Sequence, residues 1–211
     1  MAGTSNKLAI TRRPRFADRA VVASRPLSGS DAVSPTLPER GFLSMGEEGG
    51  VDRSAFLEAM RKAVATVGIV STDGPGGRFG LTVSSMSSLS VEPPSMLVCI
   101  HRNSPVIAAV AHNRAFCINF LGEGQEHVSE VFAGRHPAAN ADRFSCAEWT
   151  TIITGSPALS KAAASLDCRL ADQHQVSSHV LLIGTVVGVL INGCRVLLYH
   201  DRQYRRLNWG L

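Results

Sequence analysis

Short apolar runs rich in β-branched residues, with few helical repeats between them, restrict the folds open to this chain. The longest run, residues 180–191, is broken by Gly184 and Gly188, falls short of a bilayer span and predicts a buried strand. Other strands are predicted at residues 67–72, 96–100, 115–121, 166–171 and 196–199. A doubly wound sheet needs a helix after nearly every strand, and this chain lacks them. We therefore expect a mainly β fold with short helices, closed or nearly closed into a barrel.

Three short helices are predicted beside these strands. Asp52 is a good N-cap for a helix whose apolar side includes Phe56, Met60, Ala63 and Val67. A second helix covers residues 104–113, with Ser104 as N-cap and Pro105 in the first turn, and a third covers residues 125–132.

The first 50 residues differ from the rest of the chain in composition. Prolines, glycines and serines interrupt any periodicity, and residues 1–30 hold six basic side chains against one acidic one. Residues 1–30 therefore carry a net charge of +5, and the remaining 181 residues sum to −1, close to neutral. We expect a flexible extension at residues 1–50 and one domain at 51–211. A transit peptide, a disordered tail and a start codon placed ahead of Met45 all remain open for the extension.

Charge and cysteine usage narrow the function classes. The chain has no basic groove with interleaved aromatics, so a nucleic-acid partner is not expected, and no run of residues predicts a membrane span. The five cysteines are odd in number and widely spaced, as in a reduced cytoplasmic protein. The seven histidines show no metal-ligand spacing, so no metal site is predicted.

A run of small hydroxyl residues follows the predicted strand that begins near Phe79. It ends at Pro93-Pro94, which closes the segment before the next strand, and contains Thr82, Ser84, Ser85, Ser87, Ser88 and Ser90. Such a run is typical of a solvated loop. The second interpretation, which composition alone favours less, is a site that holds a flat, phosphate-bearing cofactor against a closely approaching backbone. The composition leaves both interpretations open.

Two further segments carry candidate chemistry. The stretch His101-Arg102-Asn103-Ser104 leaves a strand and opens a helix, which predicts either an anion site or simple capping by Ser104. His179 follows Ser177-Ser178 at the start of a long strand, where a structural role competes with a catalytic one. The glycine-rich residues 73–77 join two strands and lack the Lys-Ser/Thr ending of a P-loop, so they predict a hairpin turn.

No residues form the nucleophile, acid–base or carboxylate pairs of common hydrolases. Serine lacks the G-x-S-x-G setting, and no cysteine lies at an electropositive helix start. In a hydroxyl-lined, anion-friendly pocket of this kind, the chemistry would belong to a cofactor.

Several motifs in one order resemble the flavin reductase-like family, which has the FMN-binding split β-barrel fold and includes the reductase components of two-component flavin monooxygenases. The resemblance covers about residues 52–207. Its motifs are Gly80-Leu81-Thr82-Val83-Ser84-Ser85, Ser88-Leu89-Ser90-Val91-Glu92-Pro93-Pro94, Cys99-Ile100-His101-Arg102-Asn103-Ser104, Phe116-Cys117-Ile118-Asn119-Phe120-Leu121, Val131-Phe132-Ala133-Gly134, Gly155-Ser156-Pro157-Ala158-Leu159, and His179 through Val186.

The resemblance also implies roles for particular residues. Thr82, Ser84 and Ser85 would lie along the isoalloxazine edge and the ribityl chain, and Ser88 and Ser90 would hold that segment against the flavin. Asn103 and Ser104 match the phosphate-contacting stretch. His179 matches a histidine that places the nicotinamide, although Ser177-Ser178 stands where the family often has Gly-Asp.

By this resemblance the chain is a homodimeric NAD(P)H:flavin oxidoreductase. It would pass a hydride from NADH or NADPH to FMN or FAD and supply reduced flavin to a partner monooxygenase or halogenase. Two alternatives remain: a flavoprotein that keeps FMN bound and reduces a corrinoid or ferric complex, and a non-catalytic flavin- or haem-binding module.

Overall fold

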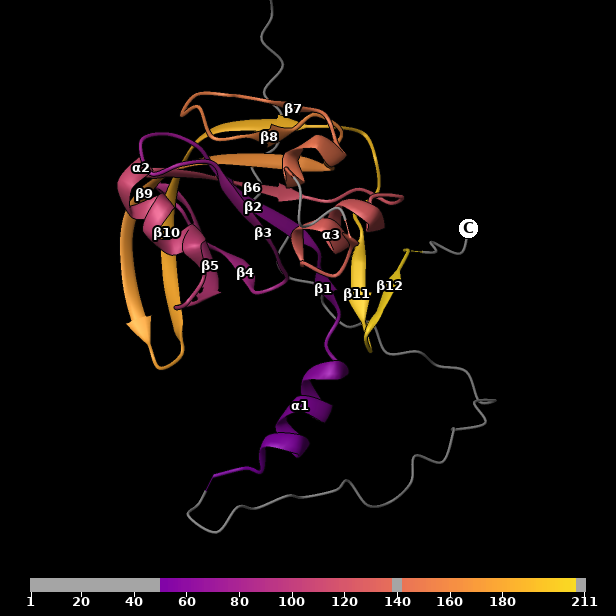
Figure 1. Ribbon diagram of the computed structural model, residues 1–211. Coiled ribbons are helices and arrows are strands. Elements are labelled where there is room, and N and C mark those ends of the chain that lie inside the picture. The colour runs from indigo at the N-terminus through magenta and orange to yellow at the C-terminus, as the bar shows by residue number, and fades with distance from the viewer. Residues whose placement is uncertain (1–49, 138–141, 208–211) are drawn as a thin grey trace, which may run out of the picture. The chain divides into compact units, whose positions relative to one another are not determined.

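The computed structural model describes residues 50–137 and 142–207, so the predicted extension at residues 1–50 lies, except for its last residue, outside the described part (Figure 1). The helices are α1 (Arg53–Arg61), α2 (Pro105–Asn113), α3 (Glu126–Phe132) and the short 3₁₀ helix η3 (Arg143–Cys146). The strands are β1 (Ala65–Thr66), β2 (Gly68–Thr72), β3 (Phe79–Val83), β4 (Met86–Val91), β5 (Pro94–His101), β6 (Ala115–Phe120), β7 (Trp149–Thr150), β8 (Ala158–Leu159), β9 (Ala164–Val176), β10 (His179–Ile191), β11 (Leu198–His200) and β12 (Gln203–Arg205).

Seven of these strands form one antiparallel sheet in the order β3-β2-β6-β9-β10-β5-β4. A smaller sheet joins β1, β11 and β12, and β7 pairs with β8. The prediction of a mainly β fold with short helices is confirmed. Among the described residues, none of the helices is both long and apolar enough to cross a membrane.

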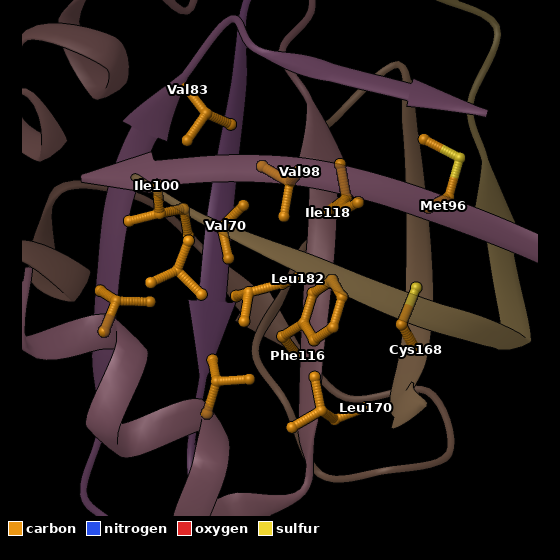
Figure 2. Close-up of a cluster of buried hydrophobic side chains, with 13 residues drawn as sticks. Val70, Val83, Met96, Val98, Ile100, Phe116, Ile118, Cys168, Leu170 and Leu182 are labelled. Atoms are coloured by element: carbon orange, nitrogen blue, oxygen red, sulfur yellow. The ribbon is translucent and has the colours of Figure 1, made fainter. Parts of the chain in front are cut away.

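The seven-stranded sheet curls around a dry core. Figure 2 shows Val70, Val98, Phe116 and Leu182 converging on it from β2, β5, β6 and β10. A Cβ added at Gly184 of β10 would come within 2.5 Å of the Phe116 ring, so glycine is required for the strand to lie this close. The interruption of the longest apolar run is therefore a packing requirement.

Two cysteines lie fully buried in this part of the sheet. Burial raises the pKa of Cys117 far above that of a free thiol, and burial likewise raises the pKa of Cys168 to about 12, with a further contribution from the nearby carboxylate of Asp167. All five cysteines are free of disulfides.

A second core lies between α3 and the small elements around it. Phe132, Phe144 and Trp149 meet there with ring centroids 5.0–5.5 Å apart, and the Trp149 indole N–H donates to the Phe144 carbonyl at 2.9 Å. Edge-to-face packing of this kind fixes the direction of η3 relative to α3.

A buried amide joins the strands at the centre of the sheet. The Asn119 side-chain N–H₂ on β6 donates to the Ile69 carbonyl (3.1 Å) and the Ser71 hydroxyl (2.9 Å) on β2. Its oxygen accepts from the Leu159 N–H (2.7 Å) and the Ser165 hydroxyl (2.8 Å). Asn119 thereby fixes β2, β8 and β9 to one another.

A buried carboxylate holds the loop ahead of β8. Asp167 on β9 is fully buried and accepts from the backbone N–H groups of Ile153 and Thr154, each at 2.7 Å, and from the Thr154 hydroxyl. These donors replace the water that the carboxylate has lost.

The structure corrects two details of the expected elements. α1 forms with Asp52 as its N-cap but ends at Arg61, so Val67 lies beyond it, and Phe56 and Met60 remain about half exposed. The hairpin of β9 and β10 is longer than predicted. Residues 172–176 are exposed and, apart from Val176, polar, yet they pair with β10 and extend both strands to 13 residues. The spacing of apolar residues cannot predict such an extension, because its side chains face solvent.

Asp167→Ala should lower the free energy of unfolding by about 3 kcal/mol, because it removes the acceptor of two backbone N–H groups and of the Thr154 hydroxyl. Urea denaturation measures the change. Asp172→Ala, on an exposed part of the same strand beside His174, is the matched control and should cost less than about 1 kcal/mol. Equal losses in the two variants would contradict a special role for the buried carboxylate.

Candidate functional site

The first hydroxyl of the predicted run lies on an edge strand. β3 pairs with β2 on one side and has no strand neighbour on the other among the described residues, so its outer N–H and C=O groups are open to a ligand. Val83 faces the barrel core, whereas Gly80 and Thr82 face α3. A Cβ at Gly80 would meet the Phe132 ring at 2.7 Å, so glycine lets α3 approach the strand.

Thr82 is anchored to α3 and lines a cavity. Its hydroxyl donates to the Ser129 carbonyl at 2.6 Å. The cavity has a volume of about 150 Å³ and is lined by Val67, Thr82, Val83, Ser84, Ser129, Ala133, Arg135, Tyr199 and Tyr204. Thr82 therefore presents its hydroxyl oxygen as an acceptor, together with its backbone, to a space with hydroxyl and guanidinium groups around it.

Tyr204 gives this cavity a fixed polar wall. Its hydroxyl donates to the Glu130 carboxylate and is hydrogen-bonded to the Ser129 hydroxyl at 3.0 Å. Burial, followed by the bond to Glu130, raises the pKa of Tyr204 to about 12. Arg135 lies 3.6 Å from the same carboxylate. The phenol is therefore protonated and held in place at neutral pH.

The serines of the run divide between lining cavities and holding backbone. Ser84 lines the first cavity and two others, of about 380 and 500 Å³. Ser85 lines the 380 Å³ cavity, and its hydroxyl donates to the Cys99 carbonyl on β5 at 2.8 Å. Ser88 on β4 lines the 500 Å³ cavity. The Ser90 hydroxyl instead donates to the Glu92 carbonyl and accepts from the Glu92 N–H, closing the β4–β5 turn.

The helix-start segment lies near the other end of β3. Ser104 is the N-cap of α2, but its side chain makes no capping bond. It lines a cavity of about 470 Å³. The other lining residues are Arg78, Phe79, Gly80, Leu81, Pro105, Val106, Asp142, Arg143 and Phe144. The Arg78 guanidinium stacks 4.0 Å from the centroid of the Phe144 ring. Asn103 lines none of these four cavities, and its backbone N–H donates to Nδ1 of His101 at 3.3 Å.

His179 lies at the start of β10, opposite His101 of β5, with their rings edge-to-face and centroids 5.4 Å apart. The Ser178 hydroxyl lies 3.0 Å from its Nδ1. The imidazole is exposed and lines none of the four cavities described above. The structure thus gathers Thr82, Ser84 and Ser85 around two cavities that share lining residues, and leaves His179 and Asn103 outside these cavities.

Sequence reasoning missed Arg78, Ser129, Arg135 and the contacts of Tyr204. α3 and the C-terminal strands bring the last three of these residues to β3 from 47 to 122 positions away, and no local spacing marks them. The Val131–Gly134 motif, which ends one residue before Arg135, was the nearest available signal.

Comparisons with known proteins agree with this geometry. The family model described as "Flavin reductase like domain" matches residues 60–208. FMN reductase (NADH) RutF 1 of Methylorubrum extorquens is 44% identical over 158 residues, which are 74% of this chain and 78% of the relative.

Two solved structures share the architecture. Flavin reductase PheA2 in its native state superposes with a TM-score of 0.69 at 25% identity, over 75% of this chain and 99% of that one. A homologue of nitrilotriacetate monooxygenase component B from Mycobacterium thermoresistibile gives a TM-score of 0.68 at 29% identity, over 74% of this chain and 87% of that one. The predicted split-barrel fold is confirmed, and the chain belongs to the flavin reductase-like family.

Proposed function

We propose that this chain is an NADH-dependent reductase that reduces FMN and releases it to a separate enzyme. The observation that carries the proposal is the open edge of β3, with hydroxyl-lined cavities at one end and an arginine-bearing cavity at the other. The family and the name of the M. extorquens relative, which specifies FMN and NADH, support the same activity. Cavities of 380–500 Å³ lie within the range that binds small cofactors.

The flavin is proposed to lie along β3. In this arrangement Thr82, Ser84 and Ser85 contact the ring edge and the ribityl chain through hydroxyl and backbone groups, and Ser88 and Ser90 support the adjoining hairpin. Ser104 at the start of α2, with Arg78 in the same cavity, would bind the phosphate, since a helix start and a guanidinium both favour an anion. Asn103, next to Ser104 but outside that cavity, is proposed to contact the phosphate from the adjoining surface.

His179 is proposed as the residue that positions the nicotinamide. Ser178 can orient the imidazole through Nδ1, in place of a neighbouring carboxylate, and His101 limits its rotation by edge-to-face contact. When bound, the flavin supplies the hydride-accepting ring. The protein's part is to hold both rings in contact and exclude water, and it needs no acid or base for that step.

We also propose that the protein is a cytoplasmic homodimer and passes reduced flavin to a partner monooxygenase. Five thiols without disulfides suit a reducing compartment. The likeness to a monooxygenase component B supports such a partner. Within a single copy, His179 lies apart from the β3 cavities. A dimer would let the His179 of one copy approach the flavin of the other.

The direct test adds NADH and free FMN to the purified protein and follows NADH loss by its near-ultraviolet absorbance. Loss that depends on free FMN supports a reductase that releases its flavin. Loss that requires only a tightly bound yellow cofactor and another acceptor, or no loss at all, would reject this proposal.

Ser84→Ala should weaken FMN binding about three- to tenfold, because it removes one hydroxyl bond to the ligand. Quenching of flavin fluorescence on binding gives the dissociation constant. Ser95→Ala is the control, since that hydroxyl bonds to the Pro93 carbonyl on the neighbouring hairpin and should leave FMN affinity within about twofold. An unchanged affinity for Ser84→Ala would remove this residue from the site.

His179→Ala should raise the KM for NADH roughly tenfold and change the KM for FMN by less than about twofold. Steady-state kinetics with each substrate varied in turn separates the two effects. His174→Ala, on the same hairpin and paired with Asp172 at 2.8 Å, is the matched control and should alter neither. Equal increases in both KM values would make His179 a flavin ligand or a structural residue.

Removal of residues 1–44 should leave FMN reductase activity and the melting temperature unchanged, because we propose that residues 51–211 form the complete catalytic domain. The same absorbance assay and a thermal melt test this. Loss of flavin affinity or of the folded state would show that the N-terminal segment belongs to the domain.

A further inference from the structure

A cavity of about 380 Å³ lies where the end of α1 meets the turn between β11 and β12. It is lined by Leu57, Met60, Arg61, Ala63, Ala65, Ser84, Ser85, Tyr199, His200, Asp201 and Arg202. The Asp201 N–H donates to the Arg61 carbonyl at 3.2 Å, and Ala65 pairs with Tyr199 across β1 and β11. These bonds fix the two walls of the cavity relative to each other.

The cavity adjoins the proposed flavin site. Ser84 and Tyr199 line both this space and the smaller cavity beside Thr82, and Ser85 lines its near end. A ligand lying on the hydroxyl run could therefore extend into it without crossing the protein surface elsewhere.

The lining combines three kinds of group. Leu57, Met60 and Ala63 supply an apolar surface on α1 and the residues after it, and Leu57 and Met60 are 40% and 52% exposed. Arg61 and Arg202 supply two guanidiniums, and neither enters an ion pair with any residue the structure describes. Asp201 adds one carboxylate, so the site has a net positive charge.

The backbone of the turn is unusual for the residues that form it. Asp201 and Arg202 have φ values of +47° and +61°, in a two-residue hairpin turn that ordinarily uses Asn-Gly. An arginine in this conformation costs about 1 kcal/mol relative to glycine. Such a cost is expected where the side chain serves a binding role.

We propose that this cavity binds the adenosine diphosphate part of a dinucleotide. The apolar surface of α1 would contact the adenine, Asp201 would accept hydrogen bonds from ribose hydroxyls, and Arg61 and Arg202 would bind the diphosphate. The source of that group is NADH, because the flavin's own phosphate is placed at the other end of β3, beside Ser104. The assignment to a dinucleotide rests on the proposed reductase function, whereas the cavity's affinity for ADP does not.

The first experiment titrates ADP into the full-length protein by calorimetry. Arg202→Gln and Arg61→Gln should each weaken ADP binding about three- to tenfold, as expected for partly exposed charge pairs. Arg53→Gln is the control, because Arg53 lies on the same helix but does not line the cavity. Thermal melts check that each variant is folded. No ADP binding by the wild type, or equal effects of all three substitutions, would overturn the proposal.

The second experiment identifies the source of the group. If NADH occupies the cavity, Arg202→Gln should raise the KM for NADH but not for reduced nicotinamide mononucleotide, which lacks the adenylate. Weaker FAD binding with unchanged FMN binding would overturn the assignment to NADH, and with it the placement of the flavin phosphate beside Ser104. Equal effects on the long and short forms of both ligands would overturn the proposal. If the wild type binds ADP but does not oxidise NADH, the proposed reductase function is rejected and the ADP site is not.

Discussion

The buried amide of Asn119 is the contact on which the arrangement of this domain depends. Hydrogen bonds from this one side chain join β2 and β6, in the middle of the large sheet, to β8 and β9. Because each partner is buried, a shift of one strand by a single residue would leave several polar groups without partners. β2 is therefore fixed beside β6, and β3, which pairs only with β2 among the described strands, takes the edge position that the proposed site uses.

The site follows from an edge strand that no other described strand covers. α3 closes over one part of β3, through the Thr82–Ser129 bond and the close approach at Gly80, while the rest stays open between Ser84 and the start of α2. Exposed strand edges invite pairing with other chains. Here the hydroxyl run and the neighbouring β4–β5 hairpin put small hydroxyl side chains, instead of apolar ones, at that edge. Such an edge suits a soluble ligand better than a second strand.

Local chemistry predicted much of this architecture. Ser104 and Pro105 correctly placed the start of α2, and the glycine-rich residues 73–77 correctly predicted the β2–β3 hairpin. Three features could not be predicted, because they depend on partners distant in sequence. They are the exposed polar half of β9, the contact of the end of α1 with the β11–β12 turn, and the conformation of that turn at Asp201-Arg202. The same holds for Arg78 and Tyr204. The residue types of the run predicted that hydroxyl groups would contact a ligand. The arginine side chains and the Tyr204 phenol around them reach the site only through the arrangement of distant elements in the fold.

The buried thiols have a consequence for the chemistry of a flavin reductase. Reduced flavin in contact with oxygen generates peroxide, and peroxide attacks thiolates far faster than thiols. Cys117 and Cys168 lie in the sheet with raised pKa values and remain protonated at neutral pH. Oxidation of either side chain would add polar oxygen atoms to a packed interior that contains Phe116 and Gly184. Deep burial thus protects the barrel from a by-product of its own turnover.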